Sequence, residues 1–438
     1  MQRREMLKLT TLAGLGICGN RSPKAQAKIE RATRGMPSPK IKDVQVIATQ
    51  PSGPRLTVVK ITTDQDGLYG YGCSTFWMRA DAVNVSIERY LKPLLIGRPA
   101  DRIEDTWQMC ENSAQWRFGP VLNNAISGVD EALWDIKGRQ VGLPVYELLG
   151  GKCREAAETY VPLEDKDATK GFERARKRMA EGYRNFRMGF STPNQPLTGL
   201  WDAYEIFDPI PSLRDGLKLM EEVRKQLGDD VGIIFDVHRR VTPNEAVQFA
   251  KDVEHLKLFY LEDPFSNQDI PYYHQIRQQC ATPIAMGELF TNPNEYVPLI
   301  ADRLIDYMRM HISAAGGVTP CRKAAAMGEL MGVKTAWHGS ADISPIGHMA
   351  NVHLDMACYN FGIQEIRFYN DIDKEIFKGC PEVKNGYVYP NDAPGWGIEV
   401  DEKLAAKYPY GTGEDGIRKQ LNSGWGDYRL PDGTIIHP

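Results

Sequence analysis

The 438-residue chain lacks the features that mark several simple classes of protein. No uncharged apolar run reaches eighteen residues, which excludes a protein with several membrane-spanning helices. The eight cysteines include no Cys-x-x-Cys pair, so they indicate neither a zinc site nor a disulfide scaffold. With 42% hydrophobic and 25% charged residues, the composition is that of a globular protein. The length fits two domains, or one large barrel with a cap.

Positive charge is scarce beyond the first forty residues. Residues 1–40 hold nine Lys or Arg against two Asp or Glu, whereas the other 398 residues hold 44 against 55. Such an acidic body repels the phosphate backbone, so we expect no nucleic-acid partner.

The basic N-terminus has the pattern of an export signal. Arg3-Arg4 precede the weakly apolar stretch Met6–Cys18, and Ala25-Gln26-Ala27 resembles a signal-peptidase site. Paired arginines favour the twin-arginine route, which carries folded proteins, and so predict a periplasmic location. The alternative is a disordered basic tail on a cytoplasmic protein. In both cases we assign residues 1–36 to a signal and linker outside the fold.

Strand-like runs recur about every twenty-five residues in the middle of the chain. Each is β-branched or aromatic and precedes a helical pattern; the runs are Tyr183–Gly189, Val231–Val237, Leu258–Asp263, Pro283–Leu289, Tyr307–Ile312 and Val333–His338. Thr242-Pro243-Asn244-Glu245, a capping box, and Thr319-Pro320 mark helix starts. Six or more such units predict an α/β fold of the closed (β/α) barrel type. An open doubly wound sheet is the alternative, but no glycine-rich phosphate turn follows the first strand.

The sequence before the barrel has a different pattern. Ile41–Thr49, Leu56–Thr63 and Leu68–Gly72 alternate like short strands, and Asp64-Gln65-Asp66-Gly67 predicts a hairpin turn. Residues 81–145 follow as mostly helix. We therefore expect an α+β capping domain over residues 37–150, the barrel over 151–390, and a C-terminal segment, 391–438, that packs back on the capping domain.

Three carboxylates stand at the ends of successive predicted strands. Asp236, Glu262 and Glu288 are separated by 26 and 26 residues. Because the carboxyl ends of barrel strands share one rim, these side chains are expected to converge. Like charges this close repel unless a cation lies between them, and oxygen ligands favour Mg²⁺. A lone acidic residue there is usually a helix cap or a surface charge, but three in phase predict one Mg²⁺ per subunit.

The motifs around these residues resemble the enolase superfamily. Asp-x-His at 236–238, Leu-Glu-Asp-Pro-Phe at 261–265 and Gly-Glu at 287–288 are similar to its metal-ligand strands. The likeness is closer to the mannonate dehydratase-like branch of acid-sugar dehydratases, with starvation-sensing protein relatives. It is carried by Ala132–Gly138, Pro144–Gly151, Tyr307–Gly317, Ala336–Gly347, Asn360–Glu365, Asn391–Ile398 and Leu404–Tyr410. The resemblance implies a modified TIM barrel with an N-terminal cap, and a homo-oligomer.

The resemblance also implies a chemistry, namely removal of the proton next to a substrate carboxylate with Mg²⁺ stabilising the enediolate. His238 lies two residues past Asp236 and is expected to face the same way. By resemblance it is the acid for the departing 3-hydroxyl group. Arg309, His338 and Glu365, at or near other strand ends, are expected to bind the substrate, although Arg309 could instead pair with a metal ligand.

The general base is less clearly marked. Arg187-Met188-Gly189 replaces the Lys-x-Lys pair of many relatives, and His311 replaces the aspartate that orients the strand-seven histidine in racemases. In mannonate dehydratases an arginine at the second-strand end assists a tyrosine base from the next loop. Arg187 matches that arginine, and Tyr204 is the one tyrosine in the expected loop, residues 190–230. His238 and His338 are the alternative bases.

The expected function is therefore Mg²⁺-dependent dehydration of a sugar acid, an aldonate such as mannonate or gluconate, to a 2-keto-3-deoxy acid. Racemisation or epimerisation is a second hypothesis, disfavoured because two opposed bases are not apparent. A third is a non-catalytic or weakly active sugar-acid binding protein that keeps the metal ligands without the base.

Overall fold

The computed structural model describes residues 35–163, 168–190, 205–340, 342–411 and 428–436. The predicted export signal up to residue 34 and the predicted base Tyr204 lie outside these ranges. The chain divides into two compact units, Met1–Pro39 and Lys40–Pro438, and the fold below is that of the second. None of the helices in the described ranges combines the length and the apolarity that a membrane span requires.

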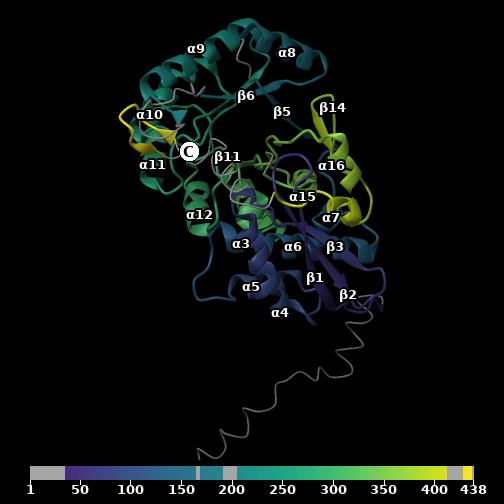
Figure 1. Cartoon of the computed structure of the whole chain (residues 1–438). Helices are drawn as coiled ribbons and strands as arrows, with labels where there is room; N and C mark the ends of the chain where they lie inside the picture. Colours follow the sequence, from purple (N-terminus) through teal and green to yellow (C-terminus); the bar gives the residue numbers. More distant parts are fainter. Residues whose placement is uncertain (1–34, 164–167, 191–204, 341, 412–427, 437–438) are drawn as a thin grey trace, which may run out of the picture. The chain divides into compact units, whose positions relative to one another are not determined.

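The first part of this unit is an antiparallel sheet covered by helices (Figure 1). Strands β1 (Ile41–Thr49), β2 (Leu56–Thr63) and β3 (Tyr69–Cys73) pair in that order, within one residue of the predicted bounds. Helices α3 (Ala80–Val85), α4 (Lys92–Leu95), α5 (Ile103–Glu111) and α6 (Pro120–Val141) follow. Helix α6 packs directly on β3, because a Cβ atom on Gly72 would overlap the carbonyl oxygen of Gly128. Glycine at both positions permits this close approach.

The second part is a curled parallel sheet of seven strands in the order β5-β6-β8-β9-β10-β11-β12. Their bounds are β5 (Tyr160–Pro162), β6 (Asn185–Gly189), β8 (Gly232–Asp236), β9 (Tyr260–Glu262), β10 (Ile284–Met286), β11 (Tyr307–Met308) and β12 (Lys334–Thr335). Isolated parallel bridges from Thr335 to Phe361 and from Thr159 to Gln364 join the two edges through residues 361–364. The closed barrel predicted from the sequence is therefore confirmed, with strands shorter than the predicted runs.

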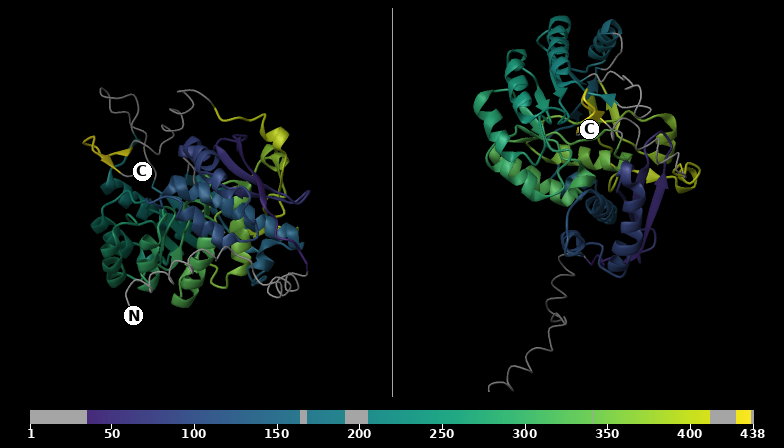
Figure 2. Two further views of the ribbon diagram at one scale, coloured as in Figure 1. Left: turned by 90° about the horizontal axis from the view of Figure 1, so that it is seen from below. Right: turned by 60° about the vertical axis from the view of Figure 1, so that its left-hand side comes forward.

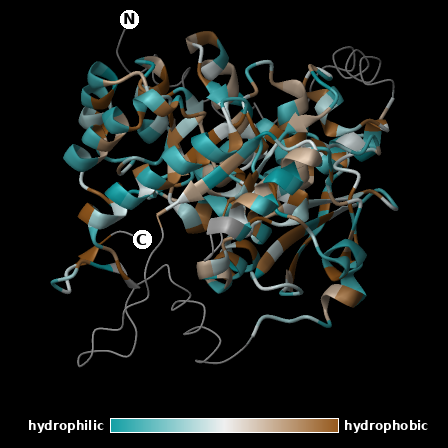
Figure 3. Ribbon diagram, turned by 90° about the horizontal axis from the view of Figure 1, so that it is seen from above, coloured by the Kyte–Doolittle hydropathy of each residue, from teal (hydrophilic) through white to brown (hydrophobic). Residues whose placement is uncertain are grey.

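Helices alternate with the strands and surround the sheet. They are α8 (Ala168–Ala180), α9 (Pro209–Leu227), α10 (Pro243–Asp252), α11 (Ile270–Gln279), α12 (Pro293–Ala301), α14 (Val318–Met331) and α15 (Pro345–Ala357). Hydrophilic and hydrophobic residues alternate along them (Figure 3), as amphipathic helices on a buried sheet require. Residues 190–230 were expected to be a loop, but the buried residues Gly216, Met220, Val223 and Leu227 give α9 an apolar face instead.

Two predicted helix starts have different outcomes. The capping box before α10 is confirmed, since the Thr242 side chain accepts from the Glu245 backbone and the Glu245 side chain accepts from Thr242 N. Helix α14 begins at Val318, with Gly317 as its N-cap, rather than after Thr319. The reason is tertiary: Asp130 of α6 accepts from Thr319 N at 2.9 Å and from its hydroxyl at 2.5 Å.

The C-terminal part of the chain has two locations. Within residues 391–411, Trp396 Nε1 donates to Tyr71 O at 3.1 Å and Tyr410 Oη donates to Leu56 O at 2.9 Å, both in the capping sheet. Strands β17 (Tyr428–Arg429) and β18 (Ile435–Ile436) instead form a sheet with β7 (Glu205–Ile206), which follows β6. This small sheet lies beside the barrel helices, apart from β1–β3 (Figure 2).

Candidate active site

The three predicted metal ligands lie at the ends of neighbouring strands. Asp236 is the last residue of β8 and pairs in register with Glu262, the last residue of β9. Glu288 follows β10 after Gly287. Asp236 and Glu262 are buried, at 6% and 0% exposed, and Glu288 is nearly so, with 11% of its side chain exposed. The barrel therefore brings three carboxylates to one rim, as predicted.

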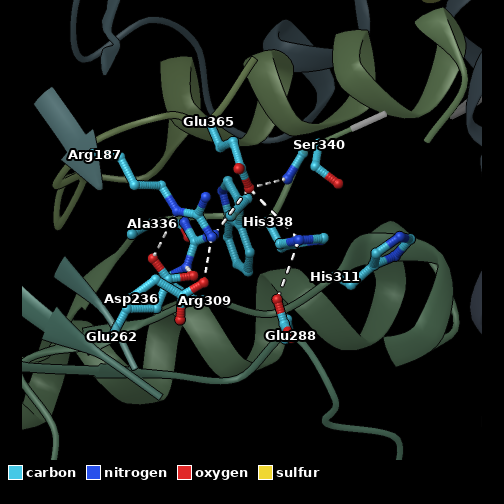
Figure 4. A network of polar contacts seen from close by, with 12 residues as sticks. Arg187, Asp236, Glu262, Glu288, Arg309, His311, Ala336, His338, Ser340 and Glu365 are labelled. Carbon is cyan, nitrogen blue, oxygen red and sulfur yellow. Dashed lines mark hydrogen bonds and ion pairs between the residues drawn. The ribbon is translucent and has the colours of Figure 1, made fainter. Parts of the chain in front are cut away.

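Two arginines contact Asp236 and Glu262 (Figure 4). The Arg187 guanidinium, from β6, donates to Asp236 Oδ2, and its Nε lies 3.4 Å from Glu262 Oε2. Arg309, just past β11, has its Nε 2.7 Å from Glu262 Oε1 and donates to Glu365 Oε2 at 2.8 Å. Burial raises the pKa of Glu262, and Arg309 and Arg187 oppose that rise. Of the two expected roles for Arg309, the contacts support pairing with a metal ligand.

Glu288 is surrounded by three cationic or ionisable groups. Its Oε1 lies 3.2 Å from His238 Nε2 and 2.8 Å from Arg239 Nη1, and its Oε2 lies 3.3 Å from His338 Nε2. Burial alone would raise the pKa of Glu288, but Arg239, His238 and His338 hold it well below its usual range. Glu288 is therefore an anion. Arg239, which also pairs with Asp263, was missed by the sequence reasoning.

A tight turn, rather than strand alternation, brings His238 to the site. Strand β8 ends at Asp236, and His238 and Arg239 have φ values of 54° and 60°. Arg240 N donates to Val237 O at 3.3 Å, so these two residues are the centre of a turn with left-handed geometry. Asp236 Oδ1 accepts from His238 N at 2.8 Å and stabilises it. Non-glycine residues in this region carry roughly 1–3 kcal/mol of strain each, which is typical of active sites.

Asp342 supplies the carboxylate near His338 that the sequence reasoning missed. Its Oδ1 lies 3.8 Å from His338 Nδ1, and its Oδ2 lies 3.5 Å from His311 Nε2. The racemase-type aspartate is absent from position 311, as noted, but a His–Asp contact is made from the loop after β12. The signal for it was the spacing of four residues from His338, on a loop already assigned to the rim.

A second candidate metal site is formed by His311, His338 and Asp342. Within the described ranges, these are the metal-ligating side chains whose ligand atoms all lie within 4.8 Å of one another. The ligand atoms of Asp236, Glu262 and Glu288 are spread more widely than that. However, His311 Nδ1 accepts a hydrogen bond from Ala314 N at 3.3 Å, which places its proton on Nε2, facing Asp342. A nitrogen that carries a proton is not a metal ligand, so His311 fits a donor to Asp342 better.

Glu365 completes the polar network. Its Oε2 accepts from Gly339 N at 2.9 Å and from Arg309, and it lies 3.7 Å from His338 Nε2. Burial would raise the pKa of Glu365, yet Arg309, His338 and Arg187 lower it to about 2. The predicted site residues Arg187, His238, Arg309, His338 and Glu365 are thus brought together with the three carboxylates. Tyr204 lies outside the described residues, so its role as the base stays a prediction.

Comparisons with known proteins agree with this arrangement. Residues 30–150 match the mandelate racemase / muconate lactonizing enzyme N-terminal domain, and residues 172–404 match the enolase C-terminal domain-like family. D-galactonate dehydratase family members from Musicola paradisiaca and Pantoea ananatis are each 47% identical to this chain, covering 91% of it and 99% of their own length. The chain belongs to the D-galactonate dehydratase family of the enolase superfamily.

A solved structure supports the same family. An enolase from Pantoea ananatis with bound D-gluconate and Mg is 46% identical, with a TM-score of 0.86, and the match covers 91% of this chain and all of that one. This family member therefore combines an enolase-type N-terminal capping domain with a barrel, and is an enzyme of the acid-sugar dehydratase class, as the motifs predicted. The family carries the name of galactonate, whereas the sequence motifs had suggested mannonate.

Proposed function

We propose that this chain is a Mg²⁺-dependent hydro-lyase that dehydrates an aldonate, gluconate or a close epimer, to a 2-keto-3-deoxy acid. The observation that carries the proposal is that the buried Asp236 and Glu262 end β8 and β9, and that Glu288 follows β10 and contacts His238. The Pantoea relative, with D-gluconate and Mg bound, supports the choice of substrate class and metal.

Asp236, Glu262 and Glu288 are the residues that would hold Mg²⁺. Their donor set consists of carboxylate oxygens, the ligand type that Mg²⁺ prefers. Glu262 Oε1 lies 2.7 Å from Arg309 Nε, so Mg²⁺ would share the Glu262 carboxylate with this arginine. When bound, Mg²⁺ stabilises the negative charge that develops on the substrate carboxylate during proton removal.

The surrounding residues bind, orient and transfer protons. His238 Nε2 lies 3.2 Å from Glu288 Oε1, and its backbone N donates to Asp236, so we assign it the role of acid for the leaving 3-hydroxyl. His338 and Glu365 present polar groups to substrate hydroxyls. Arg309 is fully buried and occupied by Glu262 and Glu365, so it orients these two carboxylates. We assign Arg187, with Tyr204, to removal of the C2 proton, as the resemblance implies.

The test is a screen of the purified Mg²⁺-loaded protein against a library of C5 and C6 sugar acids, with semicarbazide detection of the keto-deoxy product. We expect turnover of D-gluconate or an epimer of it. Binding of D-gluconate by calorimetry, with no product from any acid, would contradict dehydration and favour the sugar-acid binding protein. A C2 epimer as the product would favour the racemase hypothesis.

A further inference from the structure

Three side chains of the capping domain hold the segment that follows β11. Trp107 Nε1 donates to Gly316 O at 2.8 Å, Asp130 binds the N-terminus of α14 at Thr319, and Asn123 Nδ2 donates to Ala314 O at 2.8 Å. Asn123 differs from the other two, because the same amide group also donates to Thr291 O at 2.7 Å. Thr291 lies in the loop after β10, so one side chain of α6 joins two neighbouring loops of the barrel rim.

Both loops carry residues of the site. Thr291 is three residues after Glu288, and Ala314 is three residues after His311, whose Nδ1 accepts from Ala314 N. His311 in turn faces Asp342, which faces His338, and His338 lies 3.3 Å from Glu288. A continuous path of polar contacts therefore runs from Asn123 through the loop after β11 and back to Glu288.

The environment of Asn123 makes its two hydrogen bonds hard to replace. The residue is 2% exposed, in the first turn of a helix that packs against α13 (Ile312–Ala315). The hydrogen bond to Ala314 O is buried, and the one to Thr291 O is partly buried. Loss of the amide would remove this donor from both carbonyl groups, and a buried polar group without a partner is unfavourable. The loops would relieve that cost by moving apart toward other donors.

We propose that Asn123 is a positioning residue, which fixes the separation between Glu288 and the His311–Asp342–His338 side of the site. The inference rests on the proposed function in one respect, namely that Glu288 is a ligand of Mg²⁺. Asn123 contacts neither metal nor substrate. Its loss weakens Mg²⁺ binding and raises KM for the sugar acid by about tenfold, the range seen when groups that support metal ligands are removed.

Asn124 provides a matched control on the same helix. It is 1% exposed and its Nδ2 also donates to a carbonyl, Pro120 O at 2.7 Å, but that carbonyl belongs to α6 itself. Asn123→Ala and Asn124→Ala therefore remove the same group from equally buried positions. They differ in that Asn123→Ala breaks contacts with the barrel loops.

Two readouts test the proposal on the full-length protein. Hydrogen–deuterium exchange at residues 289–292 and 312–319 should rise in Asn123→Ala and stay at the wild-type rate in Asn124→Ala. Calorimetric titration with Mg²⁺ should show the tenfold loss of affinity in Asn123→Ala alone. Wild-type exchange in these segments, or equal Mg²⁺ affinity in the two variants, would overturn the proposal.

Two further outcomes are separable. If Asn123→Ala does not fold, Asn123→Asp, which keeps the size and removes the amide donors, is compared with Asn124→Asp in the same way. If the wild-type protein itself binds no Mg²⁺, the proposed function fails, and the exchange rates alone decide whether Asn123 joins the two loops.

Discussion

Two groups of buried carboxylates in this molecule are stabilised in opposite ways. Helix α6 carries Asp130, Glu131 and Asp135, which accept mainly from backbone N–H groups and hydroxyls; for example, Cys73 N donates to Glu131 at 2.7 Å. Burial raises the pKa of these groups to about 7, 8 and 6. At the barrel rim, arginine and histidine cations lower the pKa of Glu288 and Glu365, whereas burial still raises that of Glu262 to about 8.

The difference lies in the groups that surround each carboxyl. Hydrogen bonds from neutral donors, and Arg139 beside Asp135, lower the pKa of the α6 carboxyls, but burial has the larger effect. Asp135 accepts from Tyr71 N of β3 and from Trp396 N of the C-terminal segment, and Asp130 accepts from Thr319 N of α14. These hydrogen bonds join α6 to all three elements. Cations instead keep Glu288 and Glu365 charged, and charged oxygens are what a divalent metal binds.

Replacement of one proposed Mg²⁺ ligand should have the largest effect on Mg²⁺ binding. It also distinguishes the rim carboxylates from those of α6 most clearly. Glu262→Gln removes a charged oxygen from the rim, and we expect Mg²⁺ affinity to fall by more than about 100-fold and activity to disappear. Glu131→Gln, its control in α6, should bind Mg²⁺ like the wild type. Calorimetric titration measures both, and an unchanged affinity in Glu262→Gln would remove this residue from the metal site.

The same variant has an expected effect on stability. Arg309 is fully buried and lies 2.7 Å from Glu262, so neutralising Glu262 leaves a buried cation with one carboxylate fewer. Breaking a buried pair typically costs about 3–5 kcal/mol. We expect the metal-free Glu262→Gln protein to unfold at lower denaturant concentration than the wild type, whereas relief of repulsion among three carboxylates alone would predict the reverse.

A second substitution separates the two proton transfers. His238→Asn removes the proposed acid, and dehydration should fall by about 10²–10⁴-fold. Proton removal at C2 does not need His238, so the variant should still exchange the C2 proton in deuterated water. NMR of the sugar acid follows both events. Loss of exchange together with dehydration would show that His238 takes part in proton removal as well.

Substitution of the predicted general base, Tyr204, or of its partner, Arg187, should have an intermediate effect on turnover. Arg187 contacts Asp236 and Glu262, so Arg187→Ala should change both Mg²⁺ affinity and turnover, whereas Tyr204→Phe should lower turnover alone. If the two act as one unit in proton removal, the double variant should turn over little more slowly than the slower single one. Full activity of Tyr204→Phe in the steady-state assay would place the base elsewhere.

The smallest expected effect concerns the α6 carboxyls and is a change in how the free energy of unfolding depends on pH. The pKa of Asp130 is about 7 when folded, above its unfolded value, so the folded state holds the proton more tightly. The contribution of Asp130 to the free energy of unfolding is complete below about pH 4 and is lost as the pH rises to about 7. Over that range the free energy of unfolding falls by up to about 1.4 kcal/mol per pH unit. Asp130→Asn should remove this slope. Urea unfolding between pH 4 and 8 measures it, and parallel curves for variant and wild type would contradict the assignment.

The outline of the site could be predicted from the sequence because strand periodicity determines it. Asp236, Glu262 and Glu288 recur every 26 residues, and parallel strands in a barrel bring such positions to one rim. The closed barrel and the capping sheet followed from local patterns in the same way. His238 was placed correctly for the wrong reason, since a turn with positive φ replaces the expected strand.

The remaining contacts depend on tertiary structure. Arg239 reaches Glu288 because two successive residues adopt left-handed geometry, and Asp342 approaches His338 through the path of a loop. The N-terminus of α14 is set by Asp130, 189 residues away in the sequence. No local pattern encodes the contacts of Arg239 and Asp130, whereas Asp342 left one local signal, its spacing of four residues from His338.

The most direct test of the account is a time course of the wild-type protein with D-gluconate, followed by NMR, before metal removal, after treatment with EDTA and after Mg²⁺ is restored. The account predicts that 2-keto-3-deoxygluconate forms with Mg²⁺, stops forming in EDTA and forms again once Mg²⁺ is added back. Product formation at the same rate in EDTA would contradict it.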